Sequence, residues 1–166
     1  MLEKRNKLSK EECLSHSRKI MQNLFSTERF RQAKIIGFYM AKGSEVPTIE
    51  MIHEALKLGK KVAVPVTNDD MEFCEFSDDL TEGKFGILEP RARIPLQPDL
   101  VIVPGIAFGR CMHRLGYGKG YYDKYLKRTK AYRMGICFDF QIFNELPRHE
   151  DDVPMNEIVT EERIIK

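Results

Sequence analysis

The segment Arg114–Asp123, which reads RLGYGKGYYD, carries residue types that suit phosphate binding. Its three glycines stand at alternate positions, and glycine lets backbone N–H groups approach an anion closely. Arg114 offers a planar fork for phosphate oxygens, and Lys119 offers a mobile positive charge. A helix that follows the last glycine would add the positive end of its dipole. The segment is therefore interpreted as an anion-binding loop.

Two common phosphate-binding motifs do not match this loop. A P-loop needs a glycine five residues before its Gly-Lys pair and Ser or Thr after it, but His113 and Gly120 stand there. The dinucleotide pattern G-x-G-x-x-G fails because the third glycine comes too early. From the residues alone, an anion site and a glycine-rich turn that leads into a helix both remain open.

Asp123 falls in the first turns of the helix expected after the loop. A carboxylate beside phosphates is a typical magnesium ligand, since Mg²⁺ takes one or two carboxylates together with phosphate oxygens. The alternative is a surface acid that balances the helix dipole.

Hydrophobic periodicity places the loop among alternating helices and strands. Ser9 and Glu12 form a capping-box pattern, and Thr48 is a second candidate cap. The predicted helices are Lys10–Phe25, Thr48 to Gly59, and Gly120–Arg128. The predicted strands are Ile35–Ala41, Lys61–Val66, Met71–Phe76 (half-exposed and antiparallel), Leu100–Val103, Met134–Phe138 and Glu157–Thr160.

This alternation, with several continuously apolar strands, predicts an α/β fold with a mostly parallel sheet and helices on both faces. One domain is expected over residues 1–166, and Leu80–Pro98, rich in glycine and proline, is expected to be mostly irregular. Leu100–Val103 is the clearest central strand. Because ligands bind beyond the carboxyl ends of strands in open α/β sheets, the segment that follows it is expected at the site.

The composition narrows the class of protein. The chain has 27 Lys and Arg against 25 Asp and Glu, a near balance that argues against a dedicated nucleic-acid surface. Its four cysteines form no C-x-x-C pair, which predicts free thiols in a reducing compartment. The histidines show no zinc-ligand spacing. No apolar run reaches the ~20 residues of a membrane span, and no signal peptide is visible, so a cytoplasmic protein is expected.

The sequence RLGYGKGYYDKYL, preceded by DLVIVPGIAF, resembles the signature region of the 5-formyltetrahydrofolate cyclo-ligases. The segments SEVPT, KFGILEP and DDVPMNEIVTE resemble further landmarks of that family in the same order, from about Ser9 to Glu161. The resemblance implies a single-domain, three-layer α/β/α fold related to ribose-phosphate isomerases and CoA transferases. It also implies conversion of 5-formyltetrahydrofolate to 5,10-methenyltetrahydrofolate, with ATP as cosubstrate and Mg²⁺ as cofactor. The protein is expected to be a monomer whose partners are small molecules.

The need for ATP follows from the chemistry of this implied reaction. A formyl amide on N5 is a poor electrophile, and its oxygen would otherwise leave as hydroxide or water. Phosphorylation of that oxygen gives an activated iminium phosphate, which N10 attacks as phosphate departs. The protein's task is then alignment and charge neutralisation of the transferring phosphoryl group.

The resemblance implies roles for individual residues, and the same residue can serve more than one. The residues implied as catalytic are Arg114, Lys119 and Tyr122. The implied ATP-binding residues are Lys4, Arg5, Arg114, Leu115, Gly116, Tyr117, Gly118, Lys119, Gly120, Tyr121 and Tyr122. The implied folate-binding residues are Met40, Glu45, Tyr117, Gly118, Lys119, Gly120 and Tyr121. The implied magnesium ligands are Asp123 and Asp152, with Asp151 as an alternative to the second.

Two of these roles have simpler readings without the resemblance. Glu45 would be a solvated turn residue, although a carboxylate suits the N–H donors at the edge of a pterin. Asp152 would belong to a solvated acidic patch. The chain also departs from the family pattern, with Gly109 and Met112 where Asp and Gly are usual, and with few basic residues before the first helix.

Two rival functions would use part of the same residue pattern. A paralogue that binds folate or nucleotide without turnover would keep the same residues. An enzyme that resembles sugar-phosphate isomerases would use the phosphate site without ATP, but the joint presence of the loop, Asp123 and Glu45 disfavours it.

Overall fold

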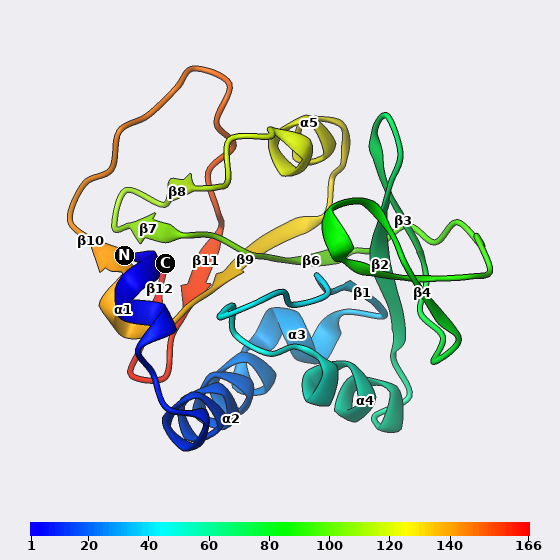
Figure 1. The fold of residues 1–166 in the computed structure, drawn as a ribbon, viewed down its shortest axis with the longest axis horizontal. Coiled ribbons are helices and arrows are strands. Elements are labelled where there is room, and N and C mark those ends of the chain that lie inside the picture. Colours follow the sequence, from blue (N-terminus) through cyan, green and yellow to red (C-terminus); the bar gives the residue numbers. More distant parts are fainter.

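The computed structural model describes residues 1–166 and is built on one seven-stranded sheet (Figure 1). The strand order is β12-β11-β9-β6-β1-β2-β3. The bounds of these strands are β1 Ile35–Gly37, β2 Lys61–Thr67, β3 Met71–Glu75, β6 Leu100–Val103, β9 Tyr132–Ile136, β11 Glu157–Val159 and β12 Ile164–Ile165.

The five inner strands, from β11 to β2, pair in parallel, and the edge strands β12 and β3 are antiparallel. This confirms the predicted mostly parallel sheet and the antiparallel Met71–Glu75. Strand β6 lies at its centre with all four residues buried, as its apolar sequence predicts. Strand β1 ends at Gly37 instead of reaching Ala41, because Phe38, Tyr39 and Met40 leave the ladder while staying buried.

Helices α2 (Lys10–Ser26), α3 (Glu28–Gln32) and α4 (Ile49–Lys57) cover one face of the sheet, and α5 (Tyr121–Arg128) covers the other (Figure 1). The larger core therefore lies under the three N-terminal helices, and the smaller one lies under α5. The capping box predicted at Ser9 and Glu12 is present, which confirms the start of α2.

Thr48 occupies the cap position of α4 but does not cap it. Its hydroxyl instead donates to the Tyr39 carbonyl at 2.6 Å, so it ties the helix to the segment that follows β1. The prediction of a Thr48 cap was therefore wrong in mechanism. Gly59, with a φ of +80°, follows the end of α4 as predicted, because glycine accepts the left-handed backbone there.

Two small sheets were not predicted. Strands β7 (Ala107–Gly109), β8 (Arg114–Leu115) and β10 (Ile142–Phe143) form one, with β7 in the middle. Strands β4 (Leu80–Glu82) and β5 (Leu88–Pro90) form a hairpin whose tip is the 3₁₀ turn η1 (Lys84–Gly86). The hairpin corrects the expectation that Leu80–Pro98 is mostly irregular. The remaining elements are α1 (Leu2–Asn6) and the 3₁₀ turn η2 (Asp139–Gln141).

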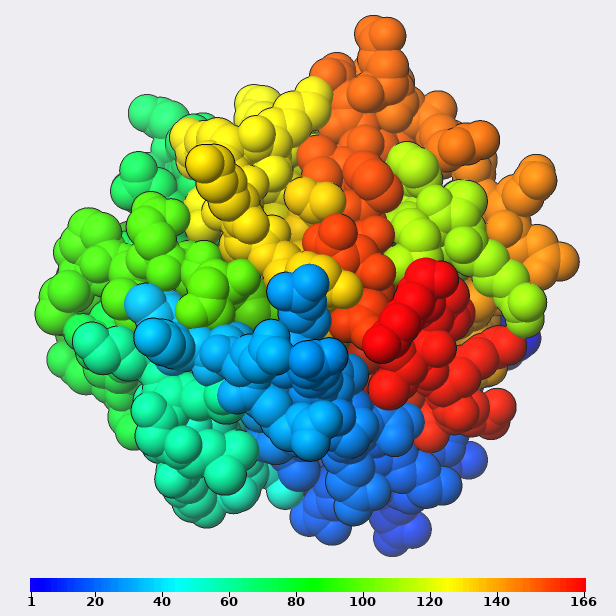
Figure 2. All heavy atoms as spheres, turned by 180° about the vertical axis from the view of Figure 1, so that it is seen from behind, coloured from blue at the N-terminus to red at the C-terminus, as the bar shows by residue number.

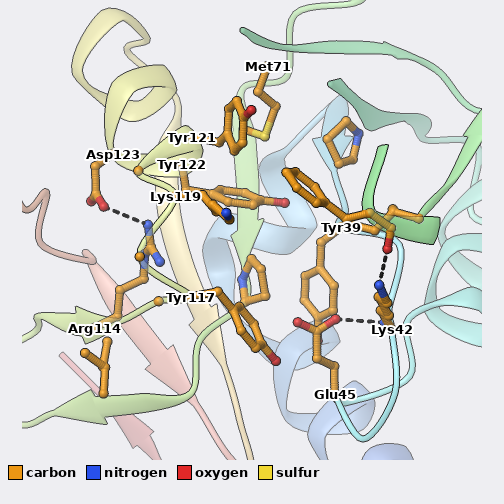
Figure 3. A pocket seen from close by; sticks show the side chains of 18 of the residues that line it. Tyr39, Lys42, Glu45, Met71, Arg114, Tyr117, Lys119, Tyr121, Tyr122 and Asp123 are labelled. Carbon is orange, nitrogen blue, oxygen red and sulfur yellow. Dashed lines mark hydrogen bonds and ion pairs between the residues drawn. The ribbon is translucent and has the colours of Figure 1, made fainter. Parts of the chain in front are cut away.

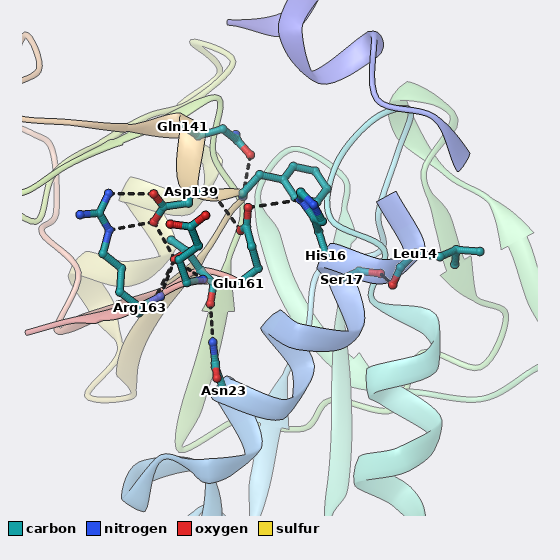
Figure 4. Close-up of polar contacts among 11 residues, drawn as sticks. Leu14, His16, Ser17, Asn23, Asp139, Gln141, Glu161 and Arg163 are labelled. Carbon is teal, nitrogen blue, oxygen red and sulfur yellow. Dashed lines mark hydrogen bonds and ion pairs between the residues drawn. The ribbon is translucent and has the colours of Figure 1, made fainter. Parts of the chain in front are cut away.

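The C-terminal segment packs against α2. Seen from behind, the red C-terminal spheres lie beside the blue spheres of the N-terminal helices (Figure 2). Thr160 is fully buried, and its hydroxyl donates to Asp139 at 2.9 Å while accepting from the Arg163 backbone N–H. Arg163 donates twice to Asp139, and Glu161 accepts the Asp139 backbone N–H while pairing with His16 of α2 (Figure 4).

The four cysteines are free, as predicted. No helix has both the length and the apolar character needed to cross a bilayer.

Candidate active site

A cavity of about 1070 Å³ opens beyond the carboxyl ends of β1, β2 and β6 (Figure 3). The glycine loop Arg114–Gly120 and the start of α5 form one wall, and residues 39–45 form the wall opposite. Strands β1 and β6 are neighbours whose chains then lead to opposite sides of the sheet. This is the switch point at which open α/β sheets bind ligands, so the expected place of the loop is confirmed.

The glycine loop depends on glycine at specific places. Gly118 and Gly120 have φ values of +81° and +71°, and Gly120 caps α5 in this left-handed conformation. At Gly116 a side chain would meet Arg114 Nη1 at 2.7 Å, so this glycine makes room for the arginine. The loop therefore exposes its backbone at the N-terminus of α5 and leaves room beside Gly116 for the Arg114 guanidinium.

Arg114 is buried in the cavity wall, and its side chain is only 6% exposed. Nη2 donates to Asp123 Oδ2 at 3.2 Å, whereas Nε has no partner. Burial lowers the pKa of Arg114, and the nearby Asp123 opposes that effect. A buried N–H without a partner costs free energy, so Nε is a donor that an acceptor on a ligand could satisfy.

The Tyr122 hydroxyl is the second buried polar group of the cavity wall without a partner. Its ring extends from α5 toward Tyr39 (Figure 3), and the Arg114 guanidinium lies 5.5 Å from the ring centroid. Burial, and next the charge of Glu45, raise the pKa of Tyr122, which therefore stays a neutral donor.

Glu45 lies on the opposite wall and is only 9% exposed. Its Oε2 accepts the Lys42 backbone N–H at 2.8 Å, which holds the carboxylate toward the cavity (Figure 3). Burial raises the pKa of Glu45, and the Lys42 N–H, Arg5 and Tyr117 offset part of that rise. Met40 lines the same wall. Glu45 is thus a buried carboxylate, and not the solvated turn residue that its sequence context alone suggests.

Asp123 and Asp152 line the same cavity, and both charges act on Arg114. Asp123 Oδ1 accepts the Val153 N–H at 3.1 Å, and Asp152 Oδ2 accepts the His149 N–H at 2.8 Å. No group of three or more His, Cys, Asp or Glu side chains is suited to hold a metal. Two carboxylates without a third fit Mg²⁺ that is carried by phosphates, but not an all-protein metal cage.

The other predicted site residues divide into two sets. Arg5, Leu115, Tyr117, Lys119 and Tyr121 line the cavity with the glycines. Lys4 does not line it and instead lies 6.0 Å from the ring centroid of Phe140. The structure therefore brings together every predicted site residue except Lys4. Asp151 also lines the cavity, where it pairs with Lys127.

The tip of the β4–β5 hairpin also lines the cavity, although none of its residues was predicted to belong to the site. Phe85 has a φ of 63°, and its carbonyl accepts from the Lys42 side chain of the opposite wall. Lys84 donates to the Tyr121 hydroxyl at 3.0 Å, and Lys119 lies 5.5 Å from the Phe85 ring centroid. The hairpin tip thus contacts both walls. An aromatic residue between Gly83 and Gly86 was the signal that could have found it.

The chain forms a regular turn at Gly109 and Met112, the two positions at which its sequence departs from the expected pattern. Met112 has a φ of 68°, the left-handed backbone that the glycine usual in the family would adopt more easily. Its N–H donates to the Gly109 carbonyl at 2.9 Å, and a side chain on Gly109 would meet Cys111 Sγ at 2.7 Å. Cys111 therefore fills the space that a side chain at Gly109 would need.

The sheet and the cavity define an α/β protein in which a glycine loop at a helix N-terminus faces a buried carboxylate. The family model of the 5-formyltetrahydrofolate cyclo-ligase family matches residues 1–161. The chain therefore belongs to the 5-formyltetrahydrofolate cyclo-ligase family.

Individual relatives agree with this assignment. A probable 5-formyltetrahydrofolate cyclo-ligase of Schizosaccharomyces pombe is 32% identical, over 92% of this chain and 87% of the relative. The 5-formyltetrahydrofolate cyclo-ligase of Mus musculus is 30% identical over 93% and 87%. The solved structure of Aquifex aeolicus 5,10-methenyltetrahydrofolate synthetase superposes with a TM-score of 0.89 at 36% identity, covering 98% of this chain and 87% of that one.

Proposed function

We propose that this protein converts 5-formyltetrahydrofolate to 5,10-methenyltetrahydrofolate with conversion of ATP to ADP and phosphate. Family membership over residues 1–161 supports the activity. The observation that carries it at the level of the site is the unpartnered Arg114 Nε in the glycine-loop wall of a cavity whose other wall holds the buried Glu45. One wall offers donors for phosphate oxygens, and the other offers an acceptor for pterin N–H groups.

The residues act by placing two substrates against each other. The backbone N–H groups of the glycine loop, together with Arg114 and Lys119, hold the triphosphate and neutralise charge on the transferring phosphoryl group. Glu45 accepts from the pterin edge, with Met40 beside it. The γ-phosphoryl group passes to the formyl oxygen and ADP leaves. N10 then attacks the formyl carbon and releases its proton to solvent, the C–O bond breaks, and phosphate departs with the oxygen.

Tyr122 serves the transfer by donating its hydroxyl hydrogen bond to the ligand, since burial keeps the phenol neutral. Tyr117 and Tyr121 border the folate, with the glycines between them. Asp123 and Asp152 would hold Mg²⁺, which when bound adds positive charge at the phosphate oxygens. Asp123 would then exchange part of its contact with Arg114 for the metal.

The first experiment is a turnover assay. Purified protein with Mg²⁺, ATP and 5-formyltetrahydrofolate should produce the methenyl chromophore together with one phosphate for each product. Replacing ATP by a non-hydrolysable analogue should abolish the signal without preventing calorimetric binding of the folate. If both ligands bind and no chromophore forms, the protein is a binding paralogue.

The same assay, applied to three protein variants, tests the proposed metal ligands. Asp123→Asn and Asp152→Asn should raise the Mg²⁺ concentration that gives half-maximal rate, and Asp123→Asn should slow turnover by about a hundredfold or more while folate affinity changes little. Asp151→Asn should leave the Mg²⁺ requirement unchanged because Asp151 is paired with Lys127. If Asp151→Asn shifts the requirement and Asp152→Asn does not, Asp151 is the second ligand.

Further proposals follow from the same assignment. The seven-stranded sheet covered by helices on both faces supports a single domain over residues 1–166, with the three-layer fold of ribose-phosphate isomerases and CoA transferases. We also propose a cytoplasmic monomer that acts on small molecules and not on nucleic acid, in keeping with the nearly balanced charge.

A further inference from the structure

Arg5 is the one buried residue of helix α1, and it is 4% exposed. A helix of five residues is too short to be stable by itself, so its place depends on what it contacts. Leu2 and Asn6 accompany Arg5 at the cavity wall, while Glu3 and Lys4 are exposed. An arginine, and not an apolar side chain, therefore anchors α1.

The guanidinium of Arg5 joins three segments that are far apart in the chain. Nε donates to Ser44 Oγ at 2.9 Å, next to Glu45. Nη1 donates to the Gly105 carbonyl, which follows β6, at 3.4 Å. Nη2 donates to the Tyr117 hydroxyl of the glycine loop at 2.7 Å. The planar fork of one side chain thus spans both walls of the cavity, which the single ammonium group of lysine would not do.

We propose that Arg5 is a positioning residue for the folate substrate, which sets the Glu45 wall against Tyr117 of the glycine loop. This rests on the proposed function and differs from the ATP-binding role expected from the sequence. Three nitrogens of the guanidinium already donate to protein groups, one on each wall of the cavity and one after β6. These bonds use three of the five N–H donors of Arg5 to hold protein groups together, whereas Arg114 makes one bond to Asp123 and leaves its Nε free.

The charge of Arg5 also acts on Glu45. Burial raises the pKa of the Glu45 carboxyl, and Arg5 lowers it again, after the Lys42 backbone N–H. Removing the charge should therefore raise that pKa, so that folate binding requires a higher pH. The charged or titratable groups that act on Glu45 or feel its charge are Arg5, Lys42, Tyr117, Tyr39 and Tyr122.

The test compares Arg5→Ala and Arg5→Lys with Glu3→Ala, an exposed change on the same helix. We expect both Arg5 variants to weaken calorimetric binding of 5-formyltetrahydrofolate about tenfold or more, whereas ADP binding without folate changes less than about threefold. Folate affinity should fall at low pH as Glu45 becomes protonated, and this fall (the acid limb) should move to higher pH in Arg5→Ala. Arg5→Lys should restore that limb but not the affinity, because lysine keeps the charge and loses the fork.

The opposite pattern would overturn the proposal. If ADP affinity falls and folate affinity does not, Arg5 binds phosphate. If neither the folate affinity nor its acid limb changes, Arg5 does not position the folate. If Arg5→Ala does not fold, Ser44→Ala removes the acceptor of Arg5 Nε and should lower folate affinity in the same direction. These binding measurements need no turnover, so a wild-type protein that binds folate without reacting would contradict the proposed function and leave this test intact.

Discussion

Glu45 is a residue whose burial serves binding at the expense of stability. Because burial raises its pKa, the folded protein holds the proton more tightly than the unfolded chain does. Its contribution to stability is therefore present below the ordinary pKa of glutamate and is lost as pH rises through the raised pKa. In the proposed function, folate binding needs the ionised form, which would accept from pterin N–H donors.

Glu45→Gln should separate these two demands. The glutamine keeps a side-chain oxygen for the Lys42 N–H but never becomes charged. Relative to wild type, its free energy of unfolding in urea should rise as the pH increases from the ordinary pKa of glutamate through the raised pKa of Glu45. Its affinity for 5-formyltetrahydrofolate should fall about 10- to 100-fold, the value of a lost charged hydrogen bond. If the free energies of unfolding of the two proteins depend equally on pH, burial does not raise the pKa of Glu45.

At the scale of elements, the entry into α5 depends on a left-handed glycine. Gly120 and Gly59 both have a positive φ, and at both positions an added Cβ meets nothing within 4 Å. Alanine at either position should therefore cost the same backbone strain, about 1–2 kcal/mol. Gly59 lies at the end of α4 and does not line the cavity, so it provides a matched control.

Gly120→Ala and Gly59→Ala should lower the free energy of unfolding by similar amounts in urea titrations. Only Gly120→Ala should weaken ADP binding, by about tenfold, because the N–H groups at the start of α5 would turn away from the phosphates. Similar ADP affinities for the two variants would contradict the assigned role of the loop.

Local signals explain which elements were predictable. The start of α2 was found because Ser9 and Glu12 satisfy each other's backbone within four residues. The β4–β5 hairpin was missed because its strands are three residues each, and Gly83, Gly86 and Pro90 resemble loop composition. What holds the hairpin is long-range, since the buried Glu89 accepts the Thr67 N–H of β2 at 3.0 Å.

At the scale of the whole molecule, the network around Thr160 fastens the C-terminal segment to the rest of the fold. Thr160→Val keeps the shape but removes the hydroxyl from Asp139 and from the Arg163 N–H. We expect a loss of about 1–3 kcal/mol in the free energy of unfolding. Thr160→Ser keeps the hydroxyl and should lose less. Turnover per folded molecule should not change, because Thr160 does not line the cavity, and a selective loss of turnover would contradict this separation.

The site was only partly predictable for a similar reason. The glycine loop is contiguous, so its residue types alone suggested an anion site, with a glycine-rich turn as the open alternative. Glu45 was assigned through the family resemblance, since a single acid before a helix has no distinctive pattern. The partners of Arg5 lie 39, 100 and 112 residues away, and no sequence spacing predicts such contacts.

The parallel pairing of β1 with β6 has a consequence for how the molecule forms. Ile36 pairs with Leu100, so the two central strands β1 and β6 can pair only after the long segment between them has become compact. Closure of long loops is costly in entropy and slows folding. The cavity lies at this junction, and Arg5 adds contacts across it from the start of the chain. Recovery of folate binding after dilution from denaturant would therefore report the last steps of refolding, after most helical structure has returned.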